Sequence, residues 1–136
     1  MTKRHAACSC GQLHLTCTGE PVRISMCHCL ACQKRTGSAF SAQARFPKAQ
    51  VSDITGKSST YSRIADSGNK VTFHFCPDCG TTLYWELDVA PDLYAVALGA
   101  FADPAFPQPK FSVFEQHAHP WTLGARAHVA EENRQQ

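Results

Sequence analysis

The sequence predicts a mainly β protein, built from short antiparallel strands with little helix. Gly, Pro, Asp and Ser recur at short intervals, and the runs between them are rich in β-branched and aromatic residues, which is typical of strands. The length of 136 residues fits one domain, 1–136. With 43% hydrophobic and 18% charged residues, the chain can bury a core, which excludes a disordered or collagen-like protein.

The first predicted strand, Gln12–Thr18, shows the alternation of a half-buried strand most clearly. Leu13, Leu15 and Cys17 fall on one face, and polar residues fall on the other. Further strands are expected at Val22–Met26, Ala39–Phe46, Val51–Thr55, Thr60–Arg63, Val71–Phe75, Thr82–Leu87, Leu93–Leu98 and Lys110–Phe114.

One short helix is expected before the C-terminal tail, at Leu30–Arg35, with Gly37 as its C-cap. The polar tail Glu131–Gln136 is expected to fray. Three prolines predict a turn-rich surface loop: Pro104, Pro107 and Pro109.

The charge balance gives no support for a strongly charged partner. The 13 Lys and Arg against 11 Asp and Glu give a net charge of +2, which is too small to indicate nucleic acid or an anionic membrane as the main partner. The N-terminus lacks the apolar core of a secretory signal, and no apolar run approaches the ~20 residues of a spanning helix. We therefore expect a cytoplasmic protein, in which clustered cysteines hold metal or do redox chemistry.

Seven of the eight cysteines form three close groups, and only Cys17 stands alone. The groups are Cys8 with Cys10, Cys27 with Cys29 and Cys32, and Cys76 with Cys79. Thiolates one or two residues apart can reach one zinc ion at about 2.3 Å, whereas such neighbours are awkward disulfide partners. Pro77 and Gly80 favour a tight turn around the last pair, as in a zinc knuckle, with a redox Cys-x-x-Cys or a chance pair as the alternatives.

The ligand count separates two kinds of zinc site. Four thiolates close a structural site, at Cys8, Cys10, Cys76 and Cys79. The three that remain suit a catalytic zinc with an open position, at Cys27, Cys29 and Cys32. Spacing alone also allows a different grouping, in which Cys29 and Cys32 share one structural zinc site with Cys76 and Cys79. A fourth ligand for the triplet could come from His28, His74 or Cys17. We expect Cys17 to be a buried free thiol and His28 to face solvent or support the ligands.

The cysteine groups lie within longer motifs that extend over roughly residues 7–123. These motifs are Cys8-Ser9-Cys10-Gly11, the run from Cys27 through Cys32 and Gly37 to Phe40, Phe75-Cys76-Pro77-Asp78-Cys79-Gly80, and later Gly99, Asp103-Pro104 and Pro120-Trp121. With these motifs the sequence resembles the glutathione-dependent formaldehyde-activating enzyme family, which includes centromere protein V. The resemblance implies a zinc-stabilised β-tent fold.

The resemblance also implies two zinc ions per chain. One is structural, at Cys8, Cys10, Cys76 and Cys79, and one is catalytic, at Cys27, Cys29 and Cys32. The implied activity joins glutathione and formaldehyde into S-hydroxymethylglutathione, which is a carbon-sulfur lyase reaction run in reverse. The implied partner is a small-molecule thiol or its aldehyde adduct.

The residues after Cys32 are candidate substrate contacts. Lys34 and Arg35 can pair with carboxylates, and the turn that contains Ser38 offers backbone N–H groups to an anion. The alternative is a solvated basic turn. His117 and His119 have a spacing that metal binding allows, but surface histidines are expected.

Most aromatic residues alternate with polar neighbours and are expected in the core, although an aromatic wall beside the open zinc would suit a binding cavity. They are Phe40, Phe46, Phe73, Phe75, Tyr84, Trp85 and Trp121.

Two functions from different classes fit these observations. The first is a zinc enzyme of carbon-sulfur chemistry that acts at the open three-cysteine site. The second is a non-catalytic, zinc-stabilised β module that binds a partner, and it needs saturated zinc rather than an exchangeable position. Nucleic-acid binding through zinc knuckles is disfavoured by the small net charge of +2.

Overall fold

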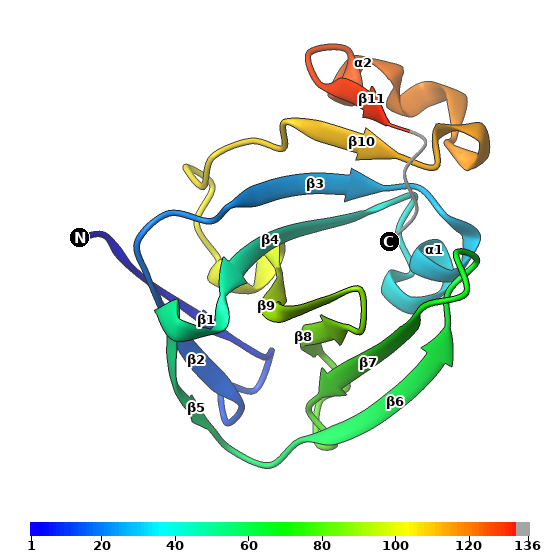
Figure 1. The fold of residues 1–136 in the computed structure, drawn as a ribbon. Coiled ribbons are helices and arrows are strands. Elements are labelled where there is room, and N and C mark those ends of the chain that lie inside the picture. Colours follow the sequence, from blue (N-terminus) through cyan, green and yellow to red (C-terminus); the bar gives the residue numbers. More distant parts are fainter. Residues whose placement is uncertain (133–136) are drawn as a thin grey trace.

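The computed structural model describes residues 1–132, and the chain forms two β-sheets (Figure 1). The smaller sheet has the strand order β1-β2-β5, with β1 (Lys3–Ala7), β2 (His14–Thr18) and β5 (Val51–Thr55). The larger has the order β11-β10-β3-β4-β9-β8-β7-β6. Its strands are β3 (Arg23–Cys27), β4 (Ser41–Pro47), β6 (Ser59–Ile64), β7 (Lys70–Phe75), β8 (Thr82–Leu87), β9 (Ala90–Ala97), β10 (Phe111–Val113) and β11 (Ala130–Glu132).

Within residues 1–132, helical structure is limited to short segments. Helix α1 (Leu30–Thr36) ends at Gly37, whose φ of 69° is the left-handed conformation that favours glycine at a C-cap. The other elements are α2 (Leu123–Arg126) and four 3₁₀ turns, η1 (Lys48–Gln50), η2 (Leu98–Phe101), η3 (Glu115–His117) and η4 (Pro120–Thr122). No helix found in residues 1–132 has both the length and the apolar character needed to cross a bilayer.

Every strand predicted from the sequence is present, with shifted ends in most cases, and so is the predicted helix. The strands β1 and β11 and the short α2 were not predicted. Pairing is antiparallel between most neighbours, as predicted, and the exceptions are the parallel pairings of β10 with β3 and with β11. The predicted fraying is also wrong for Glu131 and Glu132, which pair with β10, while 133–136 lie outside the described residues.

The main core joins the two sheets. The smaller sheet contributes Leu15 and Cys17 on β2 and Leu13 just before it. These side chains are buried in one cluster with Phe46 and Leu83 of the larger sheet. Because these side chains alternate along their strands, one face of each sheet is removed from water. The expected core position of Trp121 is wrong, because 72% of its surface is exposed.

A second apolar layer positions the site. Val71 and Phe73 on β7 lie opposite Leu87 and Trp85 on β8, and the four side chains form a buried wall. Helix α1 connects β3 to β4 and lies beside the β6–β7 hairpin in Figure 1. The fold therefore brings the cysteines around α1 to face this wall.

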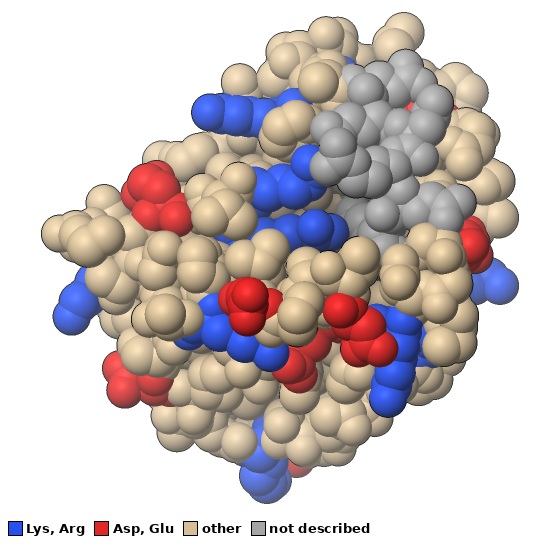
Figure 2. Space-filling view, in the orientation of Figure 1, with Lys and Arg blue, Asp and Glu red and all other residues tan. Residues whose placement is uncertain are grey.

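Charged side chains of both signs are scattered over the surface. In Figure 2, blue and red side chains alternate over the lower part of the face shown, and a blue group lies over β3 and β4. Arg23 and Arg45 occupy paired positions on these two strands. The face shown thus carries both acidic and basic groups, as the net charge of +2 suggests.

Candidate metal centres

The fold gathers seven cysteines into two separate clusters that could hold metal ions. Within each cluster all sulfur atoms lie within 4.8 Å of one another. The four-cysteine cluster contains Cys8, Cys10, Cys76 and Cys79, and the three-cysteine cluster contains Cys27, Cys29 and Cys32. The alternative in which Cys29 and Cys32 join Cys76 and Cys79 does not occur. None of the eight cysteines, all of which are described, is disulfide-bonded.

The four-cysteine cluster connects the two sheets. Cys8 and Cys10 follow β1, and Cys76 and Cys79 lie in the turn between β7 and β8. The sulfur of Cys10 lies 3.6 Å from that of Cys8 and 3.8 Å from that of Cys76. Four thiolates at about 2.3 Å from a tetrahedral zinc lie about 3.8 Å apart, so the donor set fits this ion.

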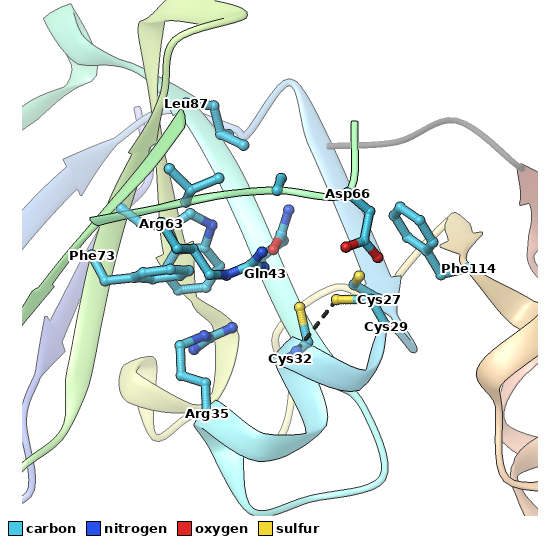
Figure 3. A pocket seen from close by; sticks show the side chains of 13 residues that line it. Cys27, Cys29, Cys32, Arg35, Gln43, Arg63, Asp66, Phe73, Leu87 and Phe114 are labelled. Carbon is cyan, nitrogen blue, oxygen red and sulfur yellow. Dashed lines mark hydrogen bonds between the residues drawn. The ribbon is translucent and has the colours of Figure 1, made fainter. Parts of the chain in front are cut away.

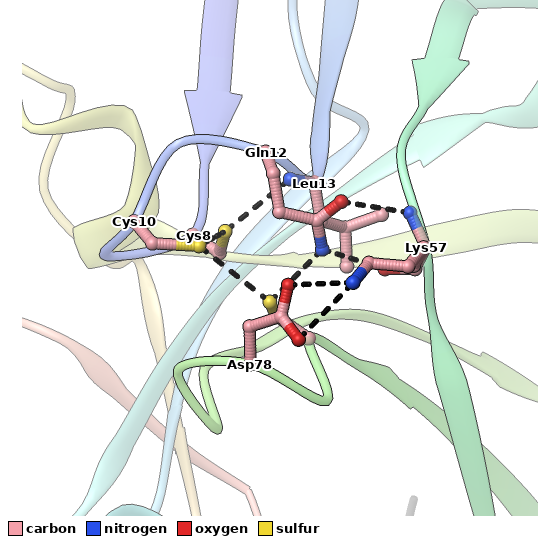
Figure 4. Close-up of polar contacts among 7 residues, drawn as sticks. Cys8, Cys10, Gln12, Leu13, Lys57 and Asp78 are labelled. Atoms are coloured by element: carbon pink, nitrogen blue, oxygen red, sulfur yellow. Dashed lines mark hydrogen bonds and ion pairs between the residues drawn. The ribbon is translucent and has the colours of Figure 1, made fainter.

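Hydrogen-bond donors around the four-cysteine cluster hold its sulfurs in place (Figure 4). The Gln12 amide donates to the Cys76 sulfur at 3.0 Å, and the Leu13 N–H donates to the Cys8 sulfur at 3.3 Å. Gln12 also accepts the N–H of Lys57 at 2.8 Å. Such partners orient thiolate ligands and favour their charged form.

Within the four-cysteine cluster, local hydrogen bonds favour the negatively charged form of Cys79. Hydrogen bonds from the Thr81 side chain and from its backbone lower the pKa of Cys79 to about 5. In the turn itself, the Gly80 N–H donates to the Cys76 carbonyl at 2.8 Å, and φ at Gly80 is 80°, as the glycine of a knuckle turn requires.

The three-cysteine cluster is built at the junction of β3 and α1. Cys27 ends β3, Cys29 is the N-cap of α1 and Cys32 lies in its first turn. The Cys29 sulfur accepts the N–H of Cys32 at 3.3 Å, so it replaces the usual Ser or Asp cap. All three side chains are at most 6% exposed. The spacing of these three cysteines in the sequence therefore places one at the end of a strand, one at the helix N-cap and one in the first helical turn.

Sharing of protons among the three thiols concentrates charge on Cys29. Hydrogen bonds from Cys27 and Cys32 lower the pKa of Cys29 to about 2, and the hydrogen bond to Cys29 raises the pKa of Cys27. Placing negative charge on all three buried sulfurs therefore requires a cation. A divalent metal ion supplies this, because its binding displaces the remaining protons.

None of the candidate fourth ligands reaches this cluster in the described structure. His28 is fully buried, so a solvent-facing role is wrong, and its Nε2 lies 3.0 Å from the Ser112 hydroxyl. His74 pairs with Glu86 at 2.7 Å. Cys17 is a buried free thiol in the main core, as expected, and burial raises its pKa to about 12.

The three sulfurs line a narrow pocket of about 20 Å³, which is room for roughly one water-sized group (Figure 3). Its apolar wall is formed by Ala65, Val71, Phe73, Trp85, Leu87 and Phe114, and its polar lining by Arg35, Gln43, Arg63 and Asp66. No local pattern marks Arg63, Asp66 or Gln43 as site residues, because only the folded hairpin and sheet bring them to the cysteines.

Arg35 is the predicted substrate contact that does face the pocket. Its guanidinium donates to the Ser41 hydroxyl at 2.9 Å and lies 4.5 Å from the centre of the Trp85 ring and 4.9 Å from that of Phe73. The Arg63 guanidinium lies 5.9 Å from the same Phe73 ring. Cation–π contacts of this kind fix the two guanidinium groups at the pocket.

An open groove of about 510 Å³ continues outward from the pocket and shares Arg35, Arg63 and Phe73 with it. Lys34 also lines this groove. Ser38 does not line the pocket or the groove, and its N–H donates to the Thr36 hydroxyl at 3.1 Å. The structure thus brings two of the three predicted substrate contacts to one surface.

His117 and His119 pack against α1 rather than forming a separate metal group in the described chain. The Gln33 amide donates to the carbonyls of His28 and His117 at 2.9 and 3.0 Å, and its oxygen lies 2.9 Å from Nε2 of His119. The Gln33 side chain therefore holds η3 next to α1, the helix that contains Cys32.

Comparison with known proteins places this arrangement in a family. The family model described as "Glutathione-dependent formaldehyde-activating enzyme" matches residues 3–117, which include both cysteine clusters. The chain belongs to this family. The match covers most of the expected core, 7–123.

Two curated relatives carry related names. A Fusarium vanettenii protein, named provisionally as a glutathione-dependent formaldehyde-activating enzyme, is 31% identical over 97 residues, 65% of this chain and 51% of its own length. An uncharacterized lyase of Schizosaccharomyces pombe is 32% identical over 85 residues, 62% of this chain and 58% of its own. The chain thus spans little more than half the length of these relatives.

A solved structure shares the fold. The crystal structure of a Rhodobacter sphaeroides protein covers 94% of this chain and 99% of its own, with a TM-score of 0.58 and 16% identity. At that identity, the likeness concerns the fold alone.

Proposed function

We propose that this chain is a zinc-dependent lyase-type enzyme that binds a thiol, or its adduct with a small aldehyde, at the three-cysteine cluster. The observation that carries the proposal is a set of three buried sulfurs that lines a pocket and has no fourth protein ligand within the described residues. Three protein ligands and an accessible fourth position are the pattern of catalytic zinc. Membership of the family supports the same chemistry.

Cys27, Cys29 and Cys32 would hold the catalytic ion, and the four-cysteine cluster would hold a structural one. Zinc bound in the triplet supplies a position at which a thiol is deprotonated at neutral pH. The apolar wall keeps water away from the sulfur, and Arg35 and Arg63 attract an anionic substrate. In the proposed reaction the thiol sulfur bonds to the carbonyl carbon, and the thiol proton ends on the carbonyl oxygen.

The limited volume of the pocket supports a small aldehyde. Space of about 20 Å³ beside the sulfurs admits a one-carbon group, whereas Phe73 and Trp85 occupy the volume that a longer aldehyde chain would need. S-hydroxymethylglutathione and related thiol adducts therefore fit the proposal, with the rest of the thiol in the outer groove.

The experiment that tests this proposal measures zinc per chain in the parent and in Cys29→Ser. We expect about two ions to fall to about one, with near-ultraviolet circular dichroism retained and thiol-aldehyde turnover lost. A parent with one ion, together with a Cys29→Ser variant that unfolds, would make the triplet structural and favour a partner-binding module. Cys17→Ala is the matched control, because Cys17 lies in neither cluster.

A further inference from the structure

Asp66 is the one carboxylate among the described residues that line the three-cysteine pocket. It lies in the turn between β6 and β7, and Figure 3 shows its carboxylate directed at the sulfurs of Cys27 and Cys29. Asp66 makes no hydrogen bond or ion pair with any residue in 1–132. Asp66 is exposed, so its carboxylate stands at the mouth of the pocket, above the cluster of sulfurs and without a protein partner in 1–132.

The metal does not supply the positive charge that this position needs. Three protein thiolates and one substrate thiolate outweigh the two positive charges of a zinc ion, so the loaded centre remains an anion. A carboxylate at the mouth of a pocket that holds an anion favours a cation between the two negative groups. The pocket therefore favours a substrate that brings a cationic group close to its sulfur.

Positive side chains line the opposite side of the same pocket. In Figure 3, Arg35 and Arg63 lie with Phe73 on the side of Cys32, away from Asp66. No ion pair joins either guanidinium to Asp66 in the described chain, although all three side chains line one pocket. The pocket is therefore polarised, with a carboxylate on one side of the sulfurs and two guanidinium groups on the other.

We propose that the pocket selects a small aminothiol acid, a thiol of the cysteine type that carries an ammonium and a carboxylate within a few bonds of its sulfur. Asp66 binds the ammonium, and Arg35 and Arg63 bind the carboxylate. This inference rests on the proposed function, because it assigns the thiol that the three-cysteine cluster takes. The narrow part of the pocket holds only about one water-sized group, so the charged groups of the thiol lie at its mouth, where Asp66 is exposed and where Arg35 and Arg63 also line the outer groove. In glutathione the ammonium is at the far end of the peptide, outside the reach of Asp66.

Binding of four thiols to the cobalt-loaded chain tests the proposal through the cobalt absorption bands. The probes are L-cysteine, cysteamine without the carboxylate, 3-mercaptopropionate without the ammonium, and glutathione. We expect L-cysteine to bind most tightly. Asp66→Asn should weaken L-cysteine and cysteamine about tenfold and leave 3-mercaptopropionate unchanged, because it removes one charge-assisted contact.

Arg63→Met gives the complementary result. We expect it to weaken L-cysteine and 3-mercaptopropionate but not cysteamine. Asp92→Asn, an exposed position on β9 outside the pocket, is the matched control and should change none of the four. Metal content and melting temperature equal to the parent show that each variant is folded.

Two results would overturn the proposal. One is an Asp66→Asn variant that changes all four affinities by the same factor or changes none. The other is a parent chain that binds glutathione more tightly than L-cysteine, which leaves the thiol-binding function standing and removes the aminothiol assignment. If no thiol alters the cobalt bands, the proposed function itself fails, and this inference fails with it.

Discussion

At the scale of single residues, Cys29 combines two roles, as the N-cap of α1 and as a member of the three-cysteine cluster. It caps α1 by accepting the N–H of Cys32 at 3.3 Å, and its sulfur belongs to the three-cysteine cluster. The cap fixes the sulfur relative to the first helical turn, so the cluster geometry is set by the backbone. A serine at this position keeps the cap and loses the thiolate, which is why Cys29→Ser tests metal binding rather than helix formation.

The ionisable side chain of Glu86 predicts how the stability of the fold depends on pH. Burial alone would raise its pKa, but hydrogen bonds from Lys48 at 2.8 Å and His74 at 2.7 Å outweigh burial and lower it. The stabilisation is therefore complete above the unfolded pKa of about 4.3 and is lost as the pH falls through the lower folded value. We expect Glu86→Gln to reduce the free energy of unfolding by about 1 kcal/mol or less at pH 6, because the group is partly screened by solvent.

Urea unfolding of the parent and of Glu86→Gln between pH 6 and pH 3 measures this effect. The difference in unfolding free energy should shrink towards zero at the acid end, whereas metal loss affects both proteins and cancels in the comparison. A difference that is constant with pH would show that the network contributes through packing alone.

At the scale of elements, the attachment of η3 to α1 depends on one amide. Gln33 makes three hydrogen bonds, to His28, His117 and His119. We expect Gln33→Ala to lower the free energy of unfolding by about 1 kcal/mol, because it removes the part-buried hydrogen bond to the His28 carbonyl and two exposed ones. Hydrogen exchange of residues 115–119 should speed up, while β7 and β8 remain protected.

The exposed neighbour Lys34 supplies the control for that experiment. Lys34→Ala, on the same helix, removes no bond to η3 and should leave exchange at 115–119 unchanged. Equal exchange in the parent and Gln33→Ala would contradict the role assigned to this amide.

The elements that sequence analysis predicted are those whose own residues carry a pattern. Gln12–Thr18 alternates apolar and polar residues, and Leu30–Arg35 is followed by Gly37, so β2 and α1 could be placed from local signals. Strand β1 reads Lys-Arg-His-Ala-Ala, which has no β-branched or aromatic residue, and it is held by pairing with β2. Pairing with a distant strand overrides local preference there, as it does for β11.

At the scale of the whole molecule, the cysteine clusters were predictable and the pocket was not. Two thiolates one or two residues apart can share an ion whatever the rest of the chain does. Arg63 and Asp66, in contrast, lie more than 30 residues from Cys32 and reach it only because β6 and β7 fold over α1 (Figure 3). No short-range pattern marks a residue whose neighbours are set by long-range pairing.

The different placement of the two clusters predicts different consequences of losing each one. The four-cysteine cluster joins the segment after β1 to the β7–β8 turn, and Cys8 and Cys76 belong to the main core that packs the two sheets together. The three-cysteine cluster lies within a single connection, β3 to α1. We therefore expect Cys76→Ser to destabilise the protein by several kcal/mol and Cys29→Ser by much less, since metal bound between sheets contributes directly to folding.

Thermal unfolding, metal content and hydrogen exchange measured together check this order. In Cys76→Ser, exchange should speed up across β1 and β2, because their sheet loses its attachment, whereas Cys29→Ser should change exchange mainly around α1. Cys17→Ala measures the cost of removing a buried thiol that binds nothing, expected at about 1 to 2 kcal/mol. If Cys29→Ser were the more destabilising variant, the open site rather than the four-cysteine cluster would hold the fold together, and the division into a structural and a catalytic metal would have to be reversed.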